Sequence, residues 1–168
     1  MSKILFVGAE TMPFAATGGL GDVMGSLPTA IKAADSECDV RVVMPLYSAV
    51  KDEWRAQMEN VASFEVKLAW RRAYCGVKSL VKDSVTYYFI ENDYYFARKT
   101  LYGEFDDGER YAFFCMAVLE MLDKIGFYPD VLHAHDWQAA LSVVYLNCLF
   151  RWRRGYDNIK TVFTIHNI

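Results

Sequence analysis

Three short segments of the sequence contain residue types and spacings that suit ligand binding or catalysis. The first, residues 13–22, contains the adjacent glycines Gly18 and Gly19. The second is the run His133-Ala134-His135-Asp136, and the third is His166, which directly follows an apolar run. Glycines can bring bare backbone N–H groups to a phosphate, and histidine and aspartate can donate, accept or bind metal. The sequence therefore offers a candidate anion-binding loop and candidate acid–base or metal-binding side chains.

The glycine segment has three interpretations. Gly18 and Gly19 precede a predicted helix, whose positive N-terminal end favours an anion such as a phosphate. Gly19, Gly21 and Gly25 resemble a dinucleotide-binding fingerprint, but that fingerprint begins directly after a strand and needs an acidic residue ending the second strand. Here a longer loop intervenes, and the second predicted strand ends in Val43-Met44-Pro45. The glycines could also serve only a turn.

The histidine and aspartate residues also leave alternatives open. Residues that alternate along a strand share a face, so His133 and His135 should lie together, with Asp136 at the junction with the next helix. Asp136 could line a ligand crevice or cap that helix. His133, His135, Asp136 and His166 have the residue types of a zinc or iron site, although their spacing differs from the usual metallohydrolase pattern. His166 could also be a hydrogen-bonded structural histidine.

Alternating strands and helices must position these segments. The apolar patterns predict strands at residues 3–9, 39–44, 85–90, 130–134 and 160–165, and helices at 20–34, 48–58, 111–122 and 137–150. The helix over 20–34 could be kinked or restarted at Pro28. Two-residue alternation from residue 61 to residue 82 predicts an inserted β-hairpin. The fold class is therefore α/β, a doubly wound, mainly parallel Rossmann-like sheet, whose ligands bind beyond the carboxyl ends of the strands.

The composition excludes several classes of protein. With 168 residues, 54% hydrophobic and 23% charged, the chain should fold as a domain rather than remain disordered. Its 18 Lys and Arg against 21 Asp and Glu leave no basic excess, so nucleic acid is not an expected partner. No apolar run approaches the ~20 residues of a membrane span. Four widely spaced cysteines without a C-x-x-C pair indicate reduced thiols, so we expect a cytoplasmic protein without a membrane partner.

Taken together, the motifs resemble those of bacterial glycogen synthases and plant starch synthases, the enzymes that use ADP-glucose. The matching residues are Lys3-Ile4-Leu5-Phe6-Val7, Glu10, Pro13, Thr17-Gly18-Gly19-Leu20-Gly21-Asp22-Val23, Leu27-Pro28, Tyr94-Tyr95-Phe96, Leu101-Tyr102-Gly103, Asp107, Arg110-Tyr111-Ala112-Phe113-Phe114, His133-Ala134-His135-Asp136-Trp137-Gln138-Ala139-Ala140 and Phe163-Thr164-Ile165-His166-Asn167-Ile168. The resemblance spans essentially the whole chain and its motifs are highly specific.

This resemblance implies a GT-B type glycosyltransferase with two Rossmann-like domains. Residues 1–168 match only the first part of the N-terminal, acceptor-binding domain, so we expect a longer protein whose C-terminal nucleotide-sugar domain lies beyond this chain. The implied reaction transfers glucose from ADP-glucose to the non-reducing end of an α-1,4-glucan with retention, without cofactor or metal. Without the second domain the isolated chain is expected to be inactive and to self-associate through its last strand.

The resemblance also implies roles for individual residues on the donor side. Gly18 and Gly19 match glycines beneath the donor diphosphate, and His166 matches a catalytic histidine close to the transferred glucose. Ala16 stands where the family usually has a lysine that faces the donor. This departure leaves open a non-catalytic glucan-binding paralogue, and a metallohydrolase is a more distant alternative.

On the acceptor side the resemblance implies four further roles. Asp136 matches a catalytic aspartate at the acceptor side of the cleft. Glu10 and Asp22 match acidic residues near the glucan, and Tyr95 is expected to contact a sugar. Carboxylates accept hydrogen bonds from sugar hydroxyls, which explains why acidic residues suit positions 10, 22 and 136.

Overall fold

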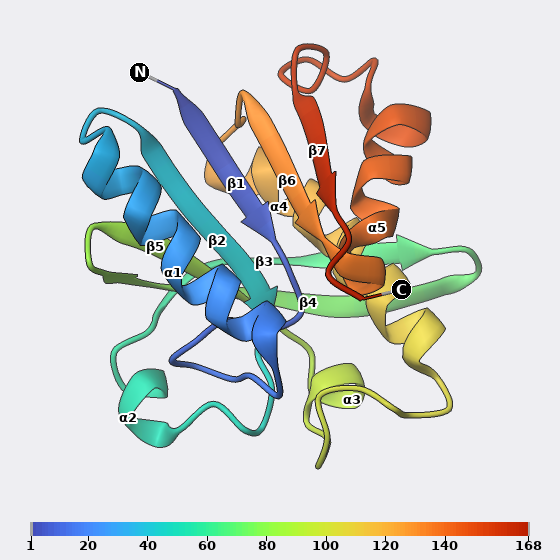
Figure 1. Cartoon of the computed structure of the whole chain (residues 1–168). Coiled ribbons are helices and arrows are strands. Elements are labelled where there is room, and N and C mark those ends of the chain that lie inside the picture. The colour runs from blue at the N-terminus through green and yellow to red at the C-terminus, as the bar shows by residue number, and fades with distance from the viewer. Residues whose placement is uncertain (1, 168) are drawn as a thin grey trace.

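The computed structural model describes residues 2–167, within which seven strands form one sheet (Figure 1). The strands are β1 (Lys3–Val7), β2 (Asp39–Pro45), β3 (Glu59–Leu68), β4 (Arg71–Lys82), β5 (Val85–Glu91), β6 (Val131–His135) and β7 (Lys160–Thr164). The helices are α1 (Gly19–Ala34), α2 (Asp52–Arg55), α3 (Asp93–Phe96), α4 (Asp107–Ile125) and α5 (Asp136–Tyr145), and a π-helical turn, Leu146–Phe150, follows α5. The predicted α/β class is confirmed.

The sheet is mainly parallel, as predicted, in the order β3-β4-β5-β2-β1-β6-β7. β1 pairs in parallel with β2 and β6, and the parallel arrangement continues to β5 on one side and β7 on the other. The predicted hairpin is β3 and β4, and β4 pairs antiparallel with β5. The hairpin therefore extends the central sheet rather than forming a separate one.

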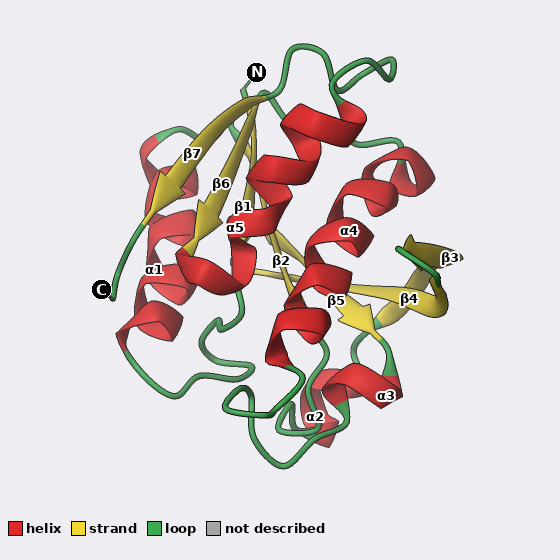
Figure 2. Ribbon diagram, turned by 90° about the vertical axis from the view of Figure 1, so that its right-hand side faces the viewer, coloured by secondary structure: helices red, strands yellow, loops and turns green. Residues whose placement is uncertain are grey.

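Helices cover both faces of the parallel part of the sheet, with α1 on one face and α4 and α5 on the other (Figure 2). The central strand β1 is apolar on both sides, and Leu5, Phe6 and Val7 are completely buried. In α4 the residues Phe114 and Val118, four positions apart, are also completely buried. This two-sided burial explains why the strand sequences show little alternation.

The predicted helices differ from the observed ones in several places. The helix predicted over residues 48–58 is only the four-residue α2. α1 continues through Pro28 without restarting. Between the predicted strand 85–90 and the predicted helix 111–122, where no element was predicted, the structure contains the single turn α3. Asn92 caps it by accepting a 3.0 Å hydrogen bond from the N–H of Tyr95. The helix predicted to reach Phe150 ends as a regular α-helix at Tyr145.

The strand β7 lies at one edge of the sheet and is only partly covered. The apolar residues Val162, Phe163 and Ile165 in and beside β7 have exposed fractions of 44%, 43% and 61%. Among the helices of residues 2–167, none combines the length and the apolar character needed to cross a membrane.

Candidate active site

The candidate active site is a pocket of about 130 Å³ beyond the carboxyl ends of β1, β6 and β7. After β1 the chain passes through α1, on one face of the sheet, to the neighbouring strand β2. After β6, which is the neighbour of β1 on its opposite side, the chain passes through α5, on the other face, to β7. Such a switch in direction leaves a crevice between the strand ends. The pocket is lined by Glu10, Gly18, Gly19, Leu20, Tyr102, Asp136, Trp137, Gln138 and Asn167. All three predicted segments therefore meet at one edge.

Glu10 organises the loop between β1 and α1. Its side chain is almost fully buried, and its carboxylate accepts hydrogen bonds from the N–H of Thr17 at 2.5 Å and from the Thr17 hydroxyl at 2.9 Å. The N–H of Gly18 adds a third bond at 3.3 Å. Tyr102 closes the arrangement, with its hydroxyl 2.6 Å from that of Thr17. The expected acceptor residue Glu10 thus lines the pocket and also positions the glycine loop.

Gly18 and Gly19 leave open space above the loop. Gly18 has an extended backbone with φ −168°, which any residue adopts, and Gly19 also lacks a positive φ. A Cβ built at either position would meet no atom within 4 Å. The turn-only interpretation therefore does not account for these two glycines, because neither local packing nor a left-handed conformation requires them.

Gly21 and Gly25 have a different reason to be glycine. A Cβ at Gly21 would lie 2.2 Å from the Cβ of Ala16, and one at Gly25 would lie 2.7 Å from the carbonyl oxygen of Met12. These two glycines let α1 pack directly against the preceding loop. This packing accounts for Gly21 and Gly25, two of the three glycines that resemble the dinucleotide fingerprint. β2 ends at Pro45 without the acidic residue that the fingerprint needs.

Asp136 adopts a left-handed backbone conformation, with φ 60°, at the junction of β6 and α5. Its side chain is buried, and its Oδ1 accepts a 2.6 Å hydrogen bond from the main-chain N–H of His166. No side chain caps the N-terminus of α5. The helix-cap interpretation of Asp136 is therefore wrong. A non-glycine residue held in this region costs on the order of 1–3 kcal/mol, a strain typical of functional sites.

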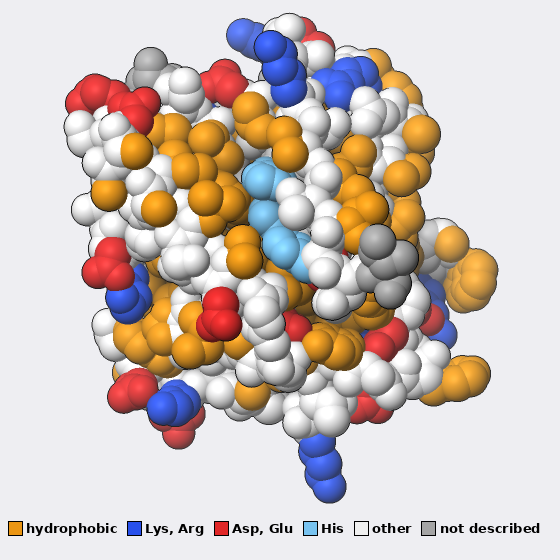
Figure 3. All heavy atoms as spheres, viewed as in Figure 1, with side chains coloured by type: hydrophobic (Ala, Val, Ile, Leu, Met, Phe, Trp, Pro, Cys, Tyr) orange, Lys and Arg blue, Asp and Glu red, His pale blue; other side chains and the backbone are white. Residues whose placement is uncertain are grey.

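The three histidines, seen in pale blue in Figure 3, form a continuous row that runs from the middle of β6 to the residues after β7. Nδ1 of His135 lies 2.9 Å from Nε2 of His166, and Nε2 of His133 lies 2.8 Å from the hydroxyl of Thr164. Burial, with smaller contributions from the neighbouring His133 and His166, lowers the pKa of His135 to about 3. Burial also lowers the pKa of His133. Both rings are therefore neutral at physiological pH.

This arrangement does not suit the metal site considered above. Nδ1 of His135 and Nε2 of His166 face each other as a hydrogen-bonded pair, and Oδ1 of Asp136 is occupied by a main-chain N–H. Within residues 2–167, no group of three or more His, Cys, Asp or Glu side chains is placed to hold a metal ion.

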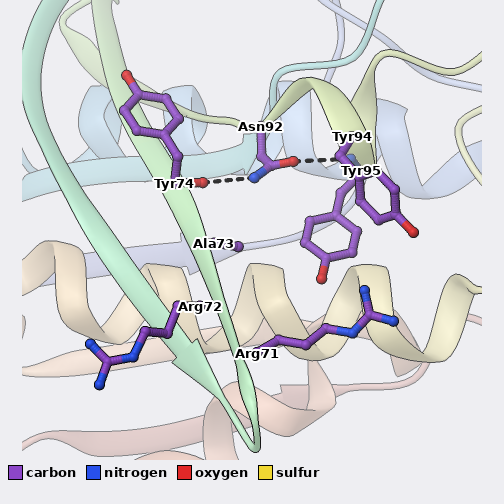
Figure 4. A pocket seen from close by; sticks show the side chains of 7 residues that line it. All are labelled: Arg71, Arg72, Ala73, Tyr74, Asn92, Tyr94 and Tyr95. Atoms are coloured by element: carbon purple, nitrogen blue, oxygen red, sulfur yellow. Dashed lines mark hydrogen bonds between the residues drawn. The ribbon is translucent and has the colours of Figure 1, made fainter.

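The other predicted residues do not line this pocket, although His166 lies beside it through its hydrogen bond to Asp136. Ala16 packs its Cβ above Gly21, and Asp22 is exposed in the first turn of α1. Tyr95 is buried in α3, donates its hydroxyl to Glu109 at 2.6 Å, and has its pKa raised by burial and by that bond. It borders a different hollow, of about 380 Å³, whose lining residues are Arg71, Arg72, Ala73, Tyr74, Asn92, Tyr94 and Tyr95 (Figure 4).

Five pocket residues were not predicted as site residues, namely Leu20, Tyr102, Trp137, Gln138 and Asn167. Gln138 and Asn167 each follow a predicted site residue closely in the sequence, so proximity to Asp136 and His166 was a usable signal. Tyr102 lacks this proximity, because its contact with Thr17 joins residues 85 positions apart, but it stands in the matching run Leu101-Tyr102-Gly103.

Comparisons with known proteins show the family to which the chain belongs. Residues 3–168 match the family model described as the starch synthase catalytic domain. The chain is 52% identical over 166 residues to a glycogen synthase of Ligilactobacillus salivarius and 50% identical to one of Streptococcus pneumoniae, covering 99% of this chain in each case. It covers 35% and 34% of those two proteins.

A solved structure is also similar, the catalytic domain of starch synthase IV from Arabidopsis thaliana bound to ADP and acarbose. Its TM-score is 0.86 at 27% identity, over 99% of this chain and 34% of that one. The family match covers nearly every residue, and the fold agrees with it. The chain belongs to the starch synthase catalytic domain family.

Proposed function

We propose that this chain belongs to a retaining glucosyltransferase that transfers glucose from ADP-glucose to the non-reducing end of an α-1,4-glucan. The observation that carries the proposal is the open space over Gly18 and Gly19, next to Asp136 and His166 at the same sheet edge. Family membership supports it, as does the solved relative, whose title names ADP and acarbose as its ligands.

The glycine loop suits the diphosphate of the donor. Gly18 and Gly19 stand at the N-terminus of the 16-residue helix α1, where the helix dipole favours negative charge. Within residues 2–167, the N–H groups of Gly19 and Leu20 donate to no protein acceptor, so both can bind phosphate oxygens. Negative charge grows on the diphosphate as it departs, and fixed N–H donors stabilise that charge without reorganising.

Asp136, which lines the pocket, and His166, which is hydrogen-bonded to it, suit the side of the cleft where the sugar reacts. One oxygen of Asp136 accepts the N–H of His166, which leaves the other oxygen for a sugar hydroxyl. A carboxylate also stabilises the positive charge that develops at the anomeric carbon in an oxocarbenium-like transition state. We assign the catalytic roles to this pair, and the acceptor side to Asp22, Tyr95 and Glu10, with Glu10 acting also through the loop that it holds.

The domain assignment is part of the same proposal. The chain spans about 35% of the length of the curated relatives that it matches. We propose that residues 1–168 form the first part of an acceptor-binding domain, and that a separate nucleotide-sugar domain completes the cleft. We also propose a cytoplasmic location, since all four cysteines are free and three of them are buried.

A non-catalytic glucan-binding paralogue is the second candidate, and Ala16 is the observation that favours it. In such a protein the pocket would bind a glucan without a donor. The two candidates differ in whether ADP-glucose binds and is consumed.

Incubation of the full-length protein with labelled ADP-glucose and glycogen tests the proposal. We expect incorporation of label that His166→Ala reduces strongly, and no incorporation by the 168-residue chain alone. Glucan binding without incorporation would favour the paralogue. Incorporation by the chain alone, above its own His166→Ala control, would refute the two-domain part of the proposal.

A further inference from the structure

We propose that His135 is a positioning residue that fixes the tautomer of His166. Nδ1 of His135 lies 2.9 Å from Nε2 of His166, and the two rings are nearly parallel, with an interplanar angle of 16°. A hydrogen bond between two ring nitrogens needs one N–H and one lone pair, and a neutral imidazole has one of each. The contact therefore couples the tautomers of the two rings, and the hydrogen position on one determines the other.

The burial of His135 decides the direction of this hydrogen bond. Its side chain is 1% exposed, and its second nitrogen, Nε2, is buried without a hydrogen-bond partner. Phe6 stacks against the ring at a centroid distance of 5.6 Å and offers no acceptor in the plane of the ring. A buried N–H without a partner is rarer in native proteins than an under-used acceptor. The hydrogen of His135 therefore lies on Nδ1 and is donated to Nε2 of His166.

The surroundings keep His135 in a single neutral form. Its ring lies against His133, at a centroid distance of 4.1 Å, and against His166, at 5.2 Å. A positive charge on His135 would be buried and close to two further imidazoles, so the charged form is disfavoured. The coupling between the two tautomers thus holds at physiological pH.

It follows that His166 carries its hydrogen on Nδ1. Among residues 2–167, no hydrogen bond involves this Nδ1, so it is available as a donor to a bound ligand. The main chain of His166 is held separately by Asp136 at 2.6 Å. His166 is thus anchored twice, through its main chain by Asp136 and through its ring by His135. That its ligand is a sugar oxygen rests on the proposed function, whereas the tautomer does not.

Nuclear magnetic resonance tests the tautomer directly. The chain contains three histidines, which is few enough for each ring to be assigned. Long-range ¹H–¹⁵N correlation spectra of ¹⁵N-labelled protein at pH 7, assigned with His133→Gln, distinguish the two tautomers of each ring. We expect Nδ1–H forms for both His135 and His166. A His166 ring protonated at Nε2 would overturn the proposal, because it would then be the donor. This outcome can be read from the unmodified protein alone.

Two variants of His135 separate positioning from packing. His135→Asn keeps a donor near the position of Nδ1, and we expect His166 to remain in its Nδ1–H form. His135→Phe fills the space without a donor, and we expect that preference to be lost. Unchanged His166 spectra in His135→Phe would contradict the proposal.

The transfer assay adds a functional readout. We expect kcat/KM to fall on the order of tenfold in His135→Phe and to be largely retained in His135→Asn, as for a misplaced catalytic group. Equal rates for His135→Phe and the parent would overturn the positioning role. Absence of transfer in every protein would refute the proposed function alone, since the spectra decide the tautomer independently.

Discussion

Asp136 and His166 are joined by a 2.6 Å hydrogen bond from the main-chain N–H of His166 to Oδ1 of Asp136. The two residues follow the adjacent parallel strands β6 and β7, whose register pairs His135 with Thr164. The bond is made entirely within the protein, so the sheet itself sets the separation of the pair. Groups positioned in this way lose little freedom when a substrate binds.

Replacing Asp136 by asparagine should reduce catalysis without unfolding the protein. Asparagine keeps the acceptor oxygen for His166 and tolerates the left-handed φ of 60°, but it removes the negative charge. We expect kcat/KM for glucose transfer to fall by about tenfold to a thousandfold, with little change in Tm. Asp136→Ala loses the acceptor oxygen and tolerates the left-handed backbone conformation less well, so it should also lower the Tm. A near-normal rate in folded Asp136→Asn would remove this residue from the site.

Alanine substitutions should separate the two kinds of glycine in the loop. Gly18→Ala and Gly19→Ala add a methyl group in open space, so the Tm should change little while the KM for ADP-glucose rises. Gly21→Ala forces a contact with Ala16 and should destabilise the fold by roughly 1–3 kcal/mol. Thermal unfolding and donor kinetics on the three variants check this. Unchanged donor kinetics in both Gly18→Ala and Gly19→Ala would argue against a diphosphate over these residues.

Introducing lysine at position 16 should tighten donor binding. A charge-assisted hydrogen bond to phosphate contributes about 1.5–3 kcal/mol. We expect Ala16→Lys to lower the KM for ADP-glucose accordingly. Ala16→Met, of comparable length without the charge, is the matched control. Equal KM values for Ala16→Lys and the control would show that the charge makes no contact with the donor.

The stability of the fold should fall as the pH decreases below about 6.5. Burial lowers the pKa of His135 from 6.5 to about 3 on folding, so between these values the unfolded chain binds a proton that the folded chain does not. The free energy of unfolding should therefore decrease by up to about 1.4 kcal/mol per pH unit from this residue. His133, with a lowered pKa, acts in the same direction. Urea unfolding at several pH values gives the free energy of unfolding as a function of pH. This free energy should depend less steeply on pH in His135→Phe than in the parent, and an equal dependence would contradict the assignment.

The isolated chain should self-associate through β7. This edge strand has unpaired backbone groups, and Phe163 within it and Ile165 just after it expose their apolar side chains. Sedimentation velocity should show concentration-dependent association that Phe163→Lys weakens. Val81→Lys, at an exposed apolar residue of β4, is the control and should have no effect. If both variants associate like the parent, another surface is responsible.

The sequence predicted the strands and the site edge better than the individual contacts. β1 and the buried face of α1 were recognisable because local apolar spacing reports which side of an element is buried. The meeting of Gly18, Asp136 and His166 followed from the rule that strand ends of a parallel sheet share an edge. The left-handed conformation of Asp136 could not be predicted, because it depends on a partner 30 residues away. The bond from Tyr95 to Glu109 likewise depends on how α3 packs against α4.

The Glu10 carboxylate, with its three bonds to the loop that follows it, has an entropic consequence. Fixing the backbone of one residue costs about 1–2 kcal/mol of conformational entropy. Glu10 orders Thr17 and Gly18 during folding, so the conformational entropy of these residues is lost in that step and not when a ligand binds. A ligand that binds above these residues therefore meets a loop whose disorder has already been removed, and more of its contact energy remains as affinity.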